Sequence, residues 1–165
     1  MTLIDDMRNA ERKQRKKVTM EIRTMSIRDY DSVYRLWTGM SGMGLNNLDD
    51  SREGIGKYLA RNPDTCFVAV MQDHIVGVIL CGHDGRRGYI YHTAVAADER
   101  GRGIGGALLD AALAALEKEG INKVALVAFS RNKTGNLFWE KCGFTVRDDL
   151  IYRNKEIKTL VRFDT

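Results

Sequence analysis

The sequence is poor in the features that mark several common classes of protein. It has a single proline, Pro63, and three cysteines that lack the CxxC spacing of zinc sites and redox motifs. We interpret Cys66, Cys81 and Cys142 as reduced core residues of a cytoplasmic protein, because disulfide frameworks need paired cysteines. No apolar run approaches the roughly 20 residues that span a bilayer, and no signal peptide is visible. We therefore expect no metal site, no disulfide and no membrane partner.

A strong charge of one sign is also missing from most of the chain. The formal net charge of the 165 residues is +4, but most of it belongs to residues 1–19, which hold six basic and three acidic side chains. The nearly neutral remainder disfavours nucleic-acid binding. We expect 1–19 to be a basic N-terminal extension, either disordered or helical, and 20–165 to be a single domain. RNA binding through the extension is the weaker alternative.

What is present is typical of a soluble globular domain, with 44% hydrophobic and 29% charged residues. Periodicity and turn residues predict the elements. Strands are expected at 20–25, 66–71, 75–81, 88–95, 123–129, 144–152 and 156–163, and helices at 26–37, 51–62, 107–116 and 135–142. The order β-α-α-β-β-β-α-β-α-β-β indicates a mixed sheet in an α/β sandwich, because consecutive hairpins precede a strand–helix–strand crossover.

The segment 38–50 is rich in glycine and asparagine but carries three apolar side chains, Met40, Met43 and Leu45. Such a loop is either a lid over a substrate or a loop pinned to the core. The sequence leaves both interpretations open.

The most informative stretch runs from the strand at 88–95 through a glycine- and arginine-rich turn into the helix at 107–116. Its glycines let the backbone approach a large polar group, and the helix directs unpaired N–H groups and a partial positive charge at the same place. Arg100 and Arg102 add full positive charge. The four glycines are Gly101, Gly103, Gly105 and Gly106. Together these features predict a site for a phosphate or pyrophosphate.

Two common phosphate-binding motifs do not account for this loop. It is not a Walker A motif, because no Gly-Lys-Ser/Thr follows. The glycines do match GxGxxG, but a dinucleotide-binding fold would need an acidic residue after the strand at 123–129, and none is present. The three strands that precede the loop also contradict a βαβ start.

A third pattern fits the loop and a second segment together. Arg100-x-x-Gly103-x-Gly105, after Ala94-Val95 at a strand end, resembles the acetyl-CoA loop of the GNAT superfamily of N-acetyltransferases. Asn132, followed by the run from Phe138 to Phe144 (FWEKCGF), resembles the late helix and turn of the same superfamily. The resemblance covers roughly 20–165. It implies a mixed, mostly antiparallel central sheet of six to seven strands flanked by about four helices.

The resemblance also implies how acetyl-CoA, the co-substrate, is held without a metal. The cofactor would occupy a notch where the strands 88–95 and 123–129 splay apart, and its pantetheine would pair with the backbone near Ala94 and Val95. The backbone of the glycine loop would bind the pyrophosphate. The implied cofactor-binding residues are Ala94, Val95, Arg100, Gly101, Arg102, Gly103, Ile104, Gly105, Gly106 and Asn132.

The implied reaction is direct attack of an amine on the thioester, with the Val95 N–H as the candidate oxyanion donor. The chain departs from ribosomal-protein acetyltransferases, because Val127 and Trp139 stand where those enzymes carry a base glutamate and an acid tyrosine. Tyr91 and Tyr89 are therefore the candidate catalytic residues, as acids for the leaving thiolate and, through a water relay, in deprotonation of the amine.

Strand alternation predicts that Tyr89, Tyr91 and Thr93 share one face and that His92 takes the other face with Ile90 and Ala94. The resemblance implies that the face of the two tyrosines is turned toward the substrate. On that reasoning His92 is a residue type that commonly acts as a base, but it has the wrong orientation. Tyr152, near the chain end, could also reach the cleft, although packing is the simpler role for it.

The sequence therefore predicts an acetyl-CoA-dependent N-acetyltransferase that acts on a primary amine of a small molecule, peptide or protein. The alternative is a module that binds or senses acyl-CoA without turnover. A homodimer is compatible with the sequence, and the acceptor amine is not identified by it.

Overall fold

The computed structural model describes residues 19–163; the extension expected at 1–19 lies, apart from Thr19, outside the described residues. The elements follow in the order β1 (Met20–Thr24), η1 (Ile27–Asp29), α2 (Tyr30–Thr38), β2 (Leu45–Asn46), α3 (Arg52–Arg61), β3 (Phe67–Met71), β4 (His74–His83), β5 (Gly88–Val95), η2 (Ala97–Glu99), α4 (Ile104–Lys118), β6 (Val124–Leu126), α5 (Lys133–Lys141) and β7 (Arg162–Phe163). The elements η1 and η2 are single 3₁₀ turns. In the described residues, the order of the four α-helices agrees with the predicted one.

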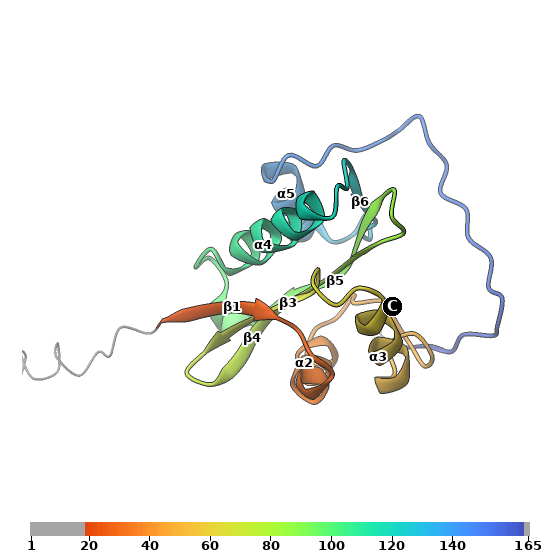
Figure 1. Ribbon diagram of the computed structural model, residues 1–165. Helices are drawn as coiled ribbons and strands as arrows, with labels where there is room; N and C mark the ends of the chain where they lie inside the picture. The colour runs from red at the N-terminus through yellow and green to blue at the C-terminus, as the bar shows by residue number, and fades with distance from the viewer. Residues whose placement is uncertain (1–18, 164–165) are drawn as a thin grey trace, which may run out of the picture.

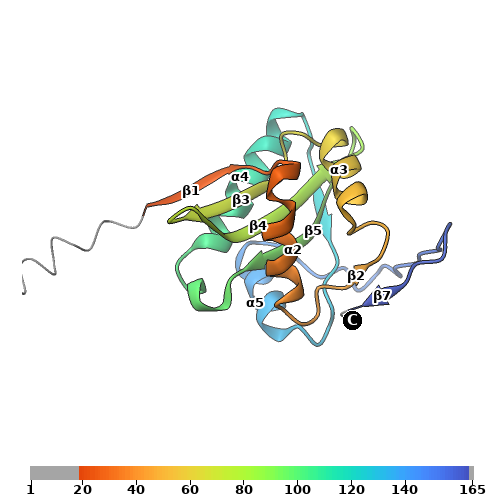
Figure 2. The same ribbon diagram turned by 90° about the horizontal axis from the view of Figure 1, so that it is seen from below.

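The central sheet has five strands in the order β1-β3-β4-β5-β6. Three neighbouring pairs are antiparallel, and β5 pairs with β6 in parallel. The parallel pair is joined through α4, which is the crossover that the sequence predicts. The strands and their right-handed twist are visible in Figure 1 and from below in Figure 2.

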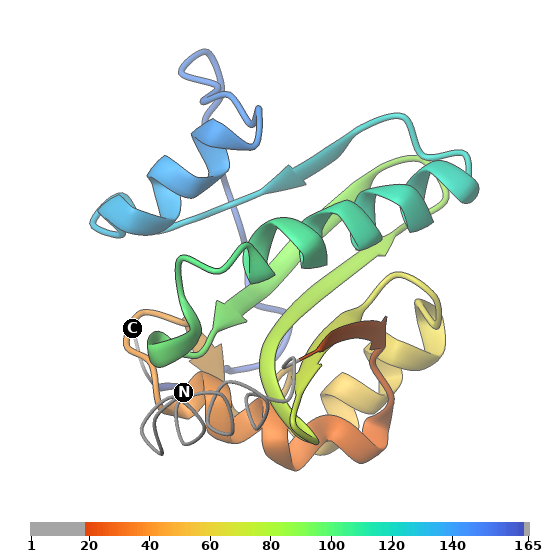
Figure 3. The same cartoon turned by 90° about the vertical axis from the view of Figure 1, so that its left-hand side faces the viewer.

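Helices cover both faces of this sheet, as Figure 3 shows. On one face α4 buries Leu108, Ala112 and Leu116, which recur every four residues and so lie on one side of the helix. On the other face α2 and α3 bury a second cluster that includes Val33 and Trp37. The two cores lie back to back across β3, β4 and β5, and this arrangement fixes the position of β5 between them.

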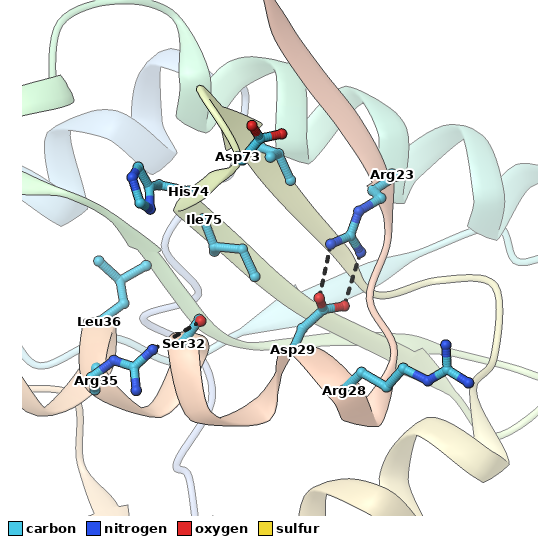
Figure 4. A pocket seen from close by; sticks show the side chains of 10 residues that line it. Arg23, Arg28, Asp29, Ser32, Arg35, Leu36, Asp73, His74 and Ile75 are labelled. Carbon is cyan, nitrogen blue, oxygen red and sulfur yellow. Dashed lines mark hydrogen bonds and ion pairs between the residues drawn. The ribbon is translucent and has the colours of Figure 1, made fainter.

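The first helical turn begins where Ser26 and Asp29 predict it. The Asp29 carboxylate accepts a hydrogen bond from the Ser26 N–H at 2.8 Å and forms a bidentate pair with Arg23. The hydrogen bonds from Arg23 hold the pKa of Asp29 below its ordinary value. Figure 4 shows this pair in a hollow of about 420 Å³ between β1, α2 and the β3–β4 hairpin. No residue of the glycine loop lines the hollow, so it is separate from the predicted cofactor site.

The three cysteines are free thiols in different surroundings. Cys66 and Cys81 are fully buried, and burial raises the pKa of each to about 12. Cys142 is only partly buried, and its pKa is raised to a smaller extent, mainly by desolvation. Cys142 is therefore less enclosed than a core position.

The predicted closing strand 144–152 is wrong, and of the predicted strand 156–163 only Arg162–Phe163 is a strand. Residues 144–161 contain no helix or strand, and the two-residue β7 pairs with β2 rather than with the central sheet. Because β6 is only three residues long, it offers little edge for another strand. Apolar side chains of this segment are accordingly exposed, with Ile157 at 100% and Ile151 at 75%. The central sheet thus has five strands, not six to seven.

The structure decides between the two interpretations of the segment 38–50. Leu45 is completely buried, and Met40 and Met43 pack against the core formed by α2 and α3. The segment is therefore pinned to the body of the domain. Within residues 19–163, no helix is long and apolar enough to cross a membrane.

Candidate active site

The glycine loop forms an open cradle at the start of α4. Gly101 and Gly103 have φ of 75° and 78°, values that favour glycine over other residues, and Gly103 is the N-cap of the helix. A Cβ atom placed on Gly101, Gly103 or Gly106 would meet no atom within 4 Å. The loop therefore leaves free space beside the unpaired N–H groups of the helix end, which suits an anion.

The two loop arginines are held differently. Arg102 forms an ion pair with Glu99, so its charge is partly compensated. Arg100 contacts no carboxylate among residues 19–163; its Nε donates to the Val95 carbonyl oxygen at 3.3 Å, and its Nη2 lies 3.8 Å from the Met40 Sδ. The charge of Arg100, which lies at the end of β5, is therefore less compensated than the charge of Arg102.

Beside the loop, β5 and β6 pair only briefly and then separate. Gly88, Tyr89 and Ile90 pair with the three residues of β6, and β5 continues for five more residues without a partner on that side. Figure 3 shows the two strands diverging. This is the splay in which the resemblance places the cofactor.

The backbone of Val95 faces this splay. The Ala96 N–H donates to the Val76 oxygen at 2.8 Å, and Val95 lies opposite Gly77 in the same register. Because hydrogen-bonded and non-bonded pairs alternate in antiparallel strands, the N–H and C=O of Val95 point away from β4. The bond from Arg100 to the Val95 oxygen agrees with this orientation. The neighbouring Ala94 buries its side chain in the core under α2 and α3.

The start of α5 lies on the far side of the splay from β5. Asn132 is the N-cap of α5, and its Oδ1 accepts a hydrogen bond from the Gly135 N–H at 2.9 Å. Its side chain thus has a capping role in addition to the predicted contact with the cofactor. The ring of Phe138 lies 3.2 Å from the position of a Cβ on Gly105, so α5 and the glycine loop are in contact.

A β-bulge overturns the predicted side-chain alternation in β5. Thr93 pairs with Ile79 and Ile90 pairs with Cys81, so two residues of β5, Tyr91 and His92, lie opposite one residue of β4. The extra residue reverses the alternation at this point. Ile90 packs in the core under α4, whereas His92 contacts Trp37 of α2 and Ala94 lies in the core on that side. His92 therefore shares a face with Tyr91, not with Ile90.

The predicted catalytic tyrosines lie together on this face. The rings of Tyr89 and Tyr91 are 4.7 Å apart, and Tyr91 packs edge-on against Tyr58 of α3. Desolvation, followed by the proximity of Tyr152, raises the pKa of Tyr89 to about 12 and raises that of Tyr91 as well. Both phenols thus stay protonated at neutral pH, so they can donate a proton but are poor direct bases.

The same face holds a pair that the sequence does not predict. The His92 Nε2 lies 2.6 Å from the Asp50 Oδ1, and their side chains are 16% and 4% exposed. The sequence predicts that Asp50 and Ser51 together cap α3, but Ser51 alone caps it, accepting a bond from the Gly54 N–H. No sequence signal could have paired two residues 42 positions apart across an unpredicted bulge.

The pinned segment between α2 and α3 touches both sides of the splay. Met40 contacts Arg100, which follows β5. A Cβ placed on Gly44 would lie 3.4 Å from the ring of Phe129, which follows β6. The segment therefore forms a fixed wall on the side of the notch where Tyr91 and His92 lie.

The two positions that differ from ribosomal-type enzymes carry side chains that cannot transfer a proton. Val127 is exposed just beyond β6. Trp139 packs against the core under α4 and against Phe144. Among the described residues, no group of three His, Cys, Asp or Glu side chains is arranged to hold a metal ion.

Comparisons with known proteins agree on one family. Residues 30–144 match the acetyltransferase (GNAT) family. The acetyltransferase SG1711 of Sodalis glossinidius is 31% identical over 138 residues, which cover 84% of this chain and 96% of that protein. Ard1 from Thermoplasma volcanium is similar in structure, with a TM-score of 0.67, 26% identity and coverage of 79% of this chain and 85% of that one. The aminoglycoside N-acetyltransferase AAC(6')-Iy in complex with CoA shares the fold, with a TM-score of 0.66, 17% identity and coverage of 86% and 97%.

Proposed function

The chain belongs to the acetyltransferase (GNAT) family and is an acyltransferase, and we propose that it transfers the acetyl group of acetyl-CoA to a primary amine of a small molecule, peptide or protein. The observation that carries this proposal is the open edge of β5 beside the glycine cradle. The cradle accepts a pyrophosphate, and the edge offers the Val95 backbone to an extended pantetheine.

Each part of the cofactor has residues suited to hold it. The pyrophosphate is bound by backbone N–H groups of the glycine loop. These are the N–H groups of Arg100, Gly101, Arg102, Gly103, Ile104, Gly105 and Gly106. Ile104 contributes its backbone only, since its side chain is buried under α4. Val95 and Asn132 complete the set, whereas Ala94, whose backbone pairs with Val78 of β4 and whose side chain is buried, contributes by holding Val95 in place. Arg100 must leave the Val95 oxygen when the pantetheine takes that place.

In the proposed reaction the amine nitrogen forms a bond to the acetyl carbonyl carbon and the carbon–sulfur bond breaks. The neutral amine loses one proton, and the leaving thiolate takes one up; an acceptor that arrives as an ammonium ion first releases a further proton to solvent. The Val95 N–H, which faces the notch, donates to the oxyanion. Tyr91, supported by Tyr89, donates the proton to the thiolate, because both phenols carry their proton at neutral pH.

The acceptor side is lined by aromatic rings. The rings of Tyr58 and Tyr89 both pack against that of Tyr91, whose side chain is exposed. Aromatic faces attract ammonium groups, so an acceptor that arrives as a cation fits this surface. Because AAC(6')-Iy is an aminoglycoside N-acetyltransferase with the same fold, aminoglycosides belong among the amines to be tested.

The test is thiol release from acetyl-CoA across a panel of aminoglycosides, polyamines and peptides with free N-termini. We expect release with at least one amine. Gly103→Glu should abolish acetyl-CoA binding, measured by calorimetry, because it places a carboxylate in the cradle.

Gly85→Glu is the matched control for Gly103→Glu. Gly85 also has a positive φ, of 91°, and a Cβ placed on it would also meet nothing within 4 Å, but it lies in the β4–β5 turn. The control should bind acetyl-CoA like the wild type. If Gly103→Glu binds as tightly as Gly85→Glu, the assigned cradle is wrong.

A module that binds acyl-CoA without turnover is the second candidate. It is favoured by Val127 and Trp139, which cannot move protons in the places where ribosomal-type relatives carry a glutamate and a tyrosine. Tight acetyl-CoA binding without thiol release for any amine in the panel would favour this module over the transferase.

A further inference from the structure

We propose that His92 accepts the proton of the acceptor amine and that Asp50 positions His92 for this step. The proposal rests on the proposed N-acetyltransferase function and supplies the base that Val127 cannot provide. Asp50 is a positioning residue, since it acts through the imidazole.

The first argument is the placement of His92. The bulge at Tyr91 and His92 turns both side chains toward α2 and α3, so the imidazole is next to a predicted catalytic tyrosine. His92 is also three residues upstream of Val95, whose N–H faces the notch. At about 3.3 Å per residue this separates the two by roughly 10 Å along the strand, a span that the acceptor amine and one bridging water can occupy.

The second argument is how firmly Asp50 is held. Its Oδ2 accepts a hydrogen bond from the Asn46 N–H at 2.7 Å, and its backbone oxygen accepts one from the Tyr30 hydroxyl at 2.8 Å. Its Oδ1 is left for His92. Contacts from β2, α2 and β5 therefore fix the carboxylate, and the carboxylate in turn fixes the imidazole ring.

The third argument is the protonation pattern that this pair imposes. A carboxylate next to Nε2 favours the tautomer with the proton on Nε2, which leaves the lone pair on Nδ1. No hydrogen bond to Nδ1 is found within residues 19–163. The amine proton moves to Nδ1, directly or through one water, while the amine lone pair forms the bond to the carbonyl carbon. Asp50 then stabilises the imidazolium.

The ionisable groups around His92 come from four segments. They are Tyr30 of α2, Asp49 and Asp50 of the segment before α3, Tyr58 of α3, and Tyr89 and Tyr91 of β5. Desolvation raises the pKa of each of the four tyrosines. They are therefore neutral at neutral pH, and the part that His92 plays in the pH dependence of the rate is read from the difference between wild type and His92→Gln.

The experiment compares wild type, His92→Gln and Asp50→Asn with the best amine of the panel. We expect His92→Gln to lower kcat about 100-fold or more, the usual scale of a lost general base, and to leave the Kd for acetyl-CoA within about threefold. The acidic limb of the pH–rate profile should disappear. Asp50→Asn should lower kcat less than His92→Gln does and should shift that limb. For His92→Ala, added imidazole should restore part of the rate.

His83→Gln is the matched control. His83 is also partly buried, with 19% of its side chain exposed, and also faces a carboxylate, that of Glu119 at 4.0 Å, but it lies at the far end of β4. It should keep the wild-type kcat and pH profile.

Three results would overturn the proposal. One is a His92→Gln enzyme with the wild-type pH profile. Another is a loss of rate without rescue of His92→Ala by imidazole, which would mean that the pair only fastens the segment before α3 to the sheet. If the histidine variants do not fold, an unshifted profile in Asp50→Asn decides against the proposal. Failure of the proposed function is distinguishable, because the wild type itself would then release no thiol.

Discussion

One inserted residue in β5 determines which of its side chains face α2 and α3. Without the bulge, simple alternation would bury His92 under α4, where Ile90 lies. With it, His92 meets Asp50 and Trp37. The chemistry available to this enzyme therefore depends on a local irregularity that neither residue type nor spacing reveals.

Tyr91→Phe tests the proposed acid. Removing the hydroxyl should lower kcat about 10- to 100-fold, because the thiolate loses its proton donor. The Kd for acetyl-CoA should change little, since the ring still packs against Tyr58 and Tyr89. Tyr34→Phe, on α2 where the ring stacks on Tyr30, is the control and should leave both values unchanged. An unaltered kcat in Tyr91→Phe would remove this residue from the mechanism.

Thiol labelling should separate the cysteines by burial. In the folded protein, iodoacetamide should modify Cys142 first, because Cys66 and Cys81 are buried and their raised pKa values keep them as thiols at neutral pH. Mass spectrometry of peptides locates the label. Cys142→Ala should then leave the folded protein unlabelled over the same time. Equal labelling of Cys66 and Cys142 would contradict this arrangement.

At the scale of elements, α3 offers a sharp test through two glycines. A Cβ on Gly54 would lie 2.3 Å from the carbonyl oxygens of Leu48 and Asp49, which are backbone atoms and cannot yield easily. We expect Gly54→Ala to lower the free energy of unfolding by about 1–3 kcal/mol. It should also lower kcat, because the displaced backbone leads directly into Asp50.

Gly56→Ala is the control within the same helix. Its Cβ would meet only the Ile27 side chain, at an ordinary 3.6 Å. It should raise the free energy of unfolding by roughly 0.5–1 kcal/mol, because alanine favours helix over glycine. Urea denaturation of both variants gives the comparison, and equal effects would show that the contact with the Leu48 and Asp49 backbone is not decisive.

The elements that the sequence predicts well are those with strong local signals. The predicted helix starts at Ser26 and Ser51 and the predicted strand 88–95 agree with the structure within a residue or two, because capping and periodicity act over short distances. The predicted helix 107–116 is shorter than α4, since the first residues of α4 also belong to the glycine loop. The closing strand 144–152 is wrong because a strand needs an edge to pair with, and β6 provides only three residues.

At the scale of the whole molecule, the segment 144–161 stands apart from the sheet. It carries exposed apolar residues and, within the described chain, no regular secondary structure, as its long excursion in Figure 1 shows. Segments with few backbone pairings open at low cost. We expect the first tryptic cleavages within residues 19–163 to occur after Arg153, Lys155 or Lys158.

Time-resolved mass spectrometry of the digest checks this expectation. Lys118, at the end of α4, serves as the internal reference and should be cut later, because its helix is packed on the sheet. Cleavage after Lys118 before the C-terminal sites would show that the segment is held more firmly than its exposure indicates.

The candidate site is predictable only in part, because only its continuous motifs can be recognised in the sequence. The glycine loop and the turn near Asn132 are continuous motifs, so their residues can be named from the chain alone. The proposed acceptor side is assembled from α2, α3, β5 and the segment between the helices. Its contacts, such as that of Gly44 with Phe129, join residues far apart in sequence and depend on packing.

The open edge of β5 has a consequence for handling the protein. Unpaired N–H and C=O groups on a strand are a template for another chain, and this strand lies in the middle of the fold. The Arg100 side chain covers one of these groups, the Val95 oxygen, and from Tyr91 to Val95 this edge has no strand partner among the described residues. Coenzyme A bound at this edge would shield it. Protein stored with coenzyme A should therefore remain monodisperse at concentrations at which the protein without coenzyme A aggregates.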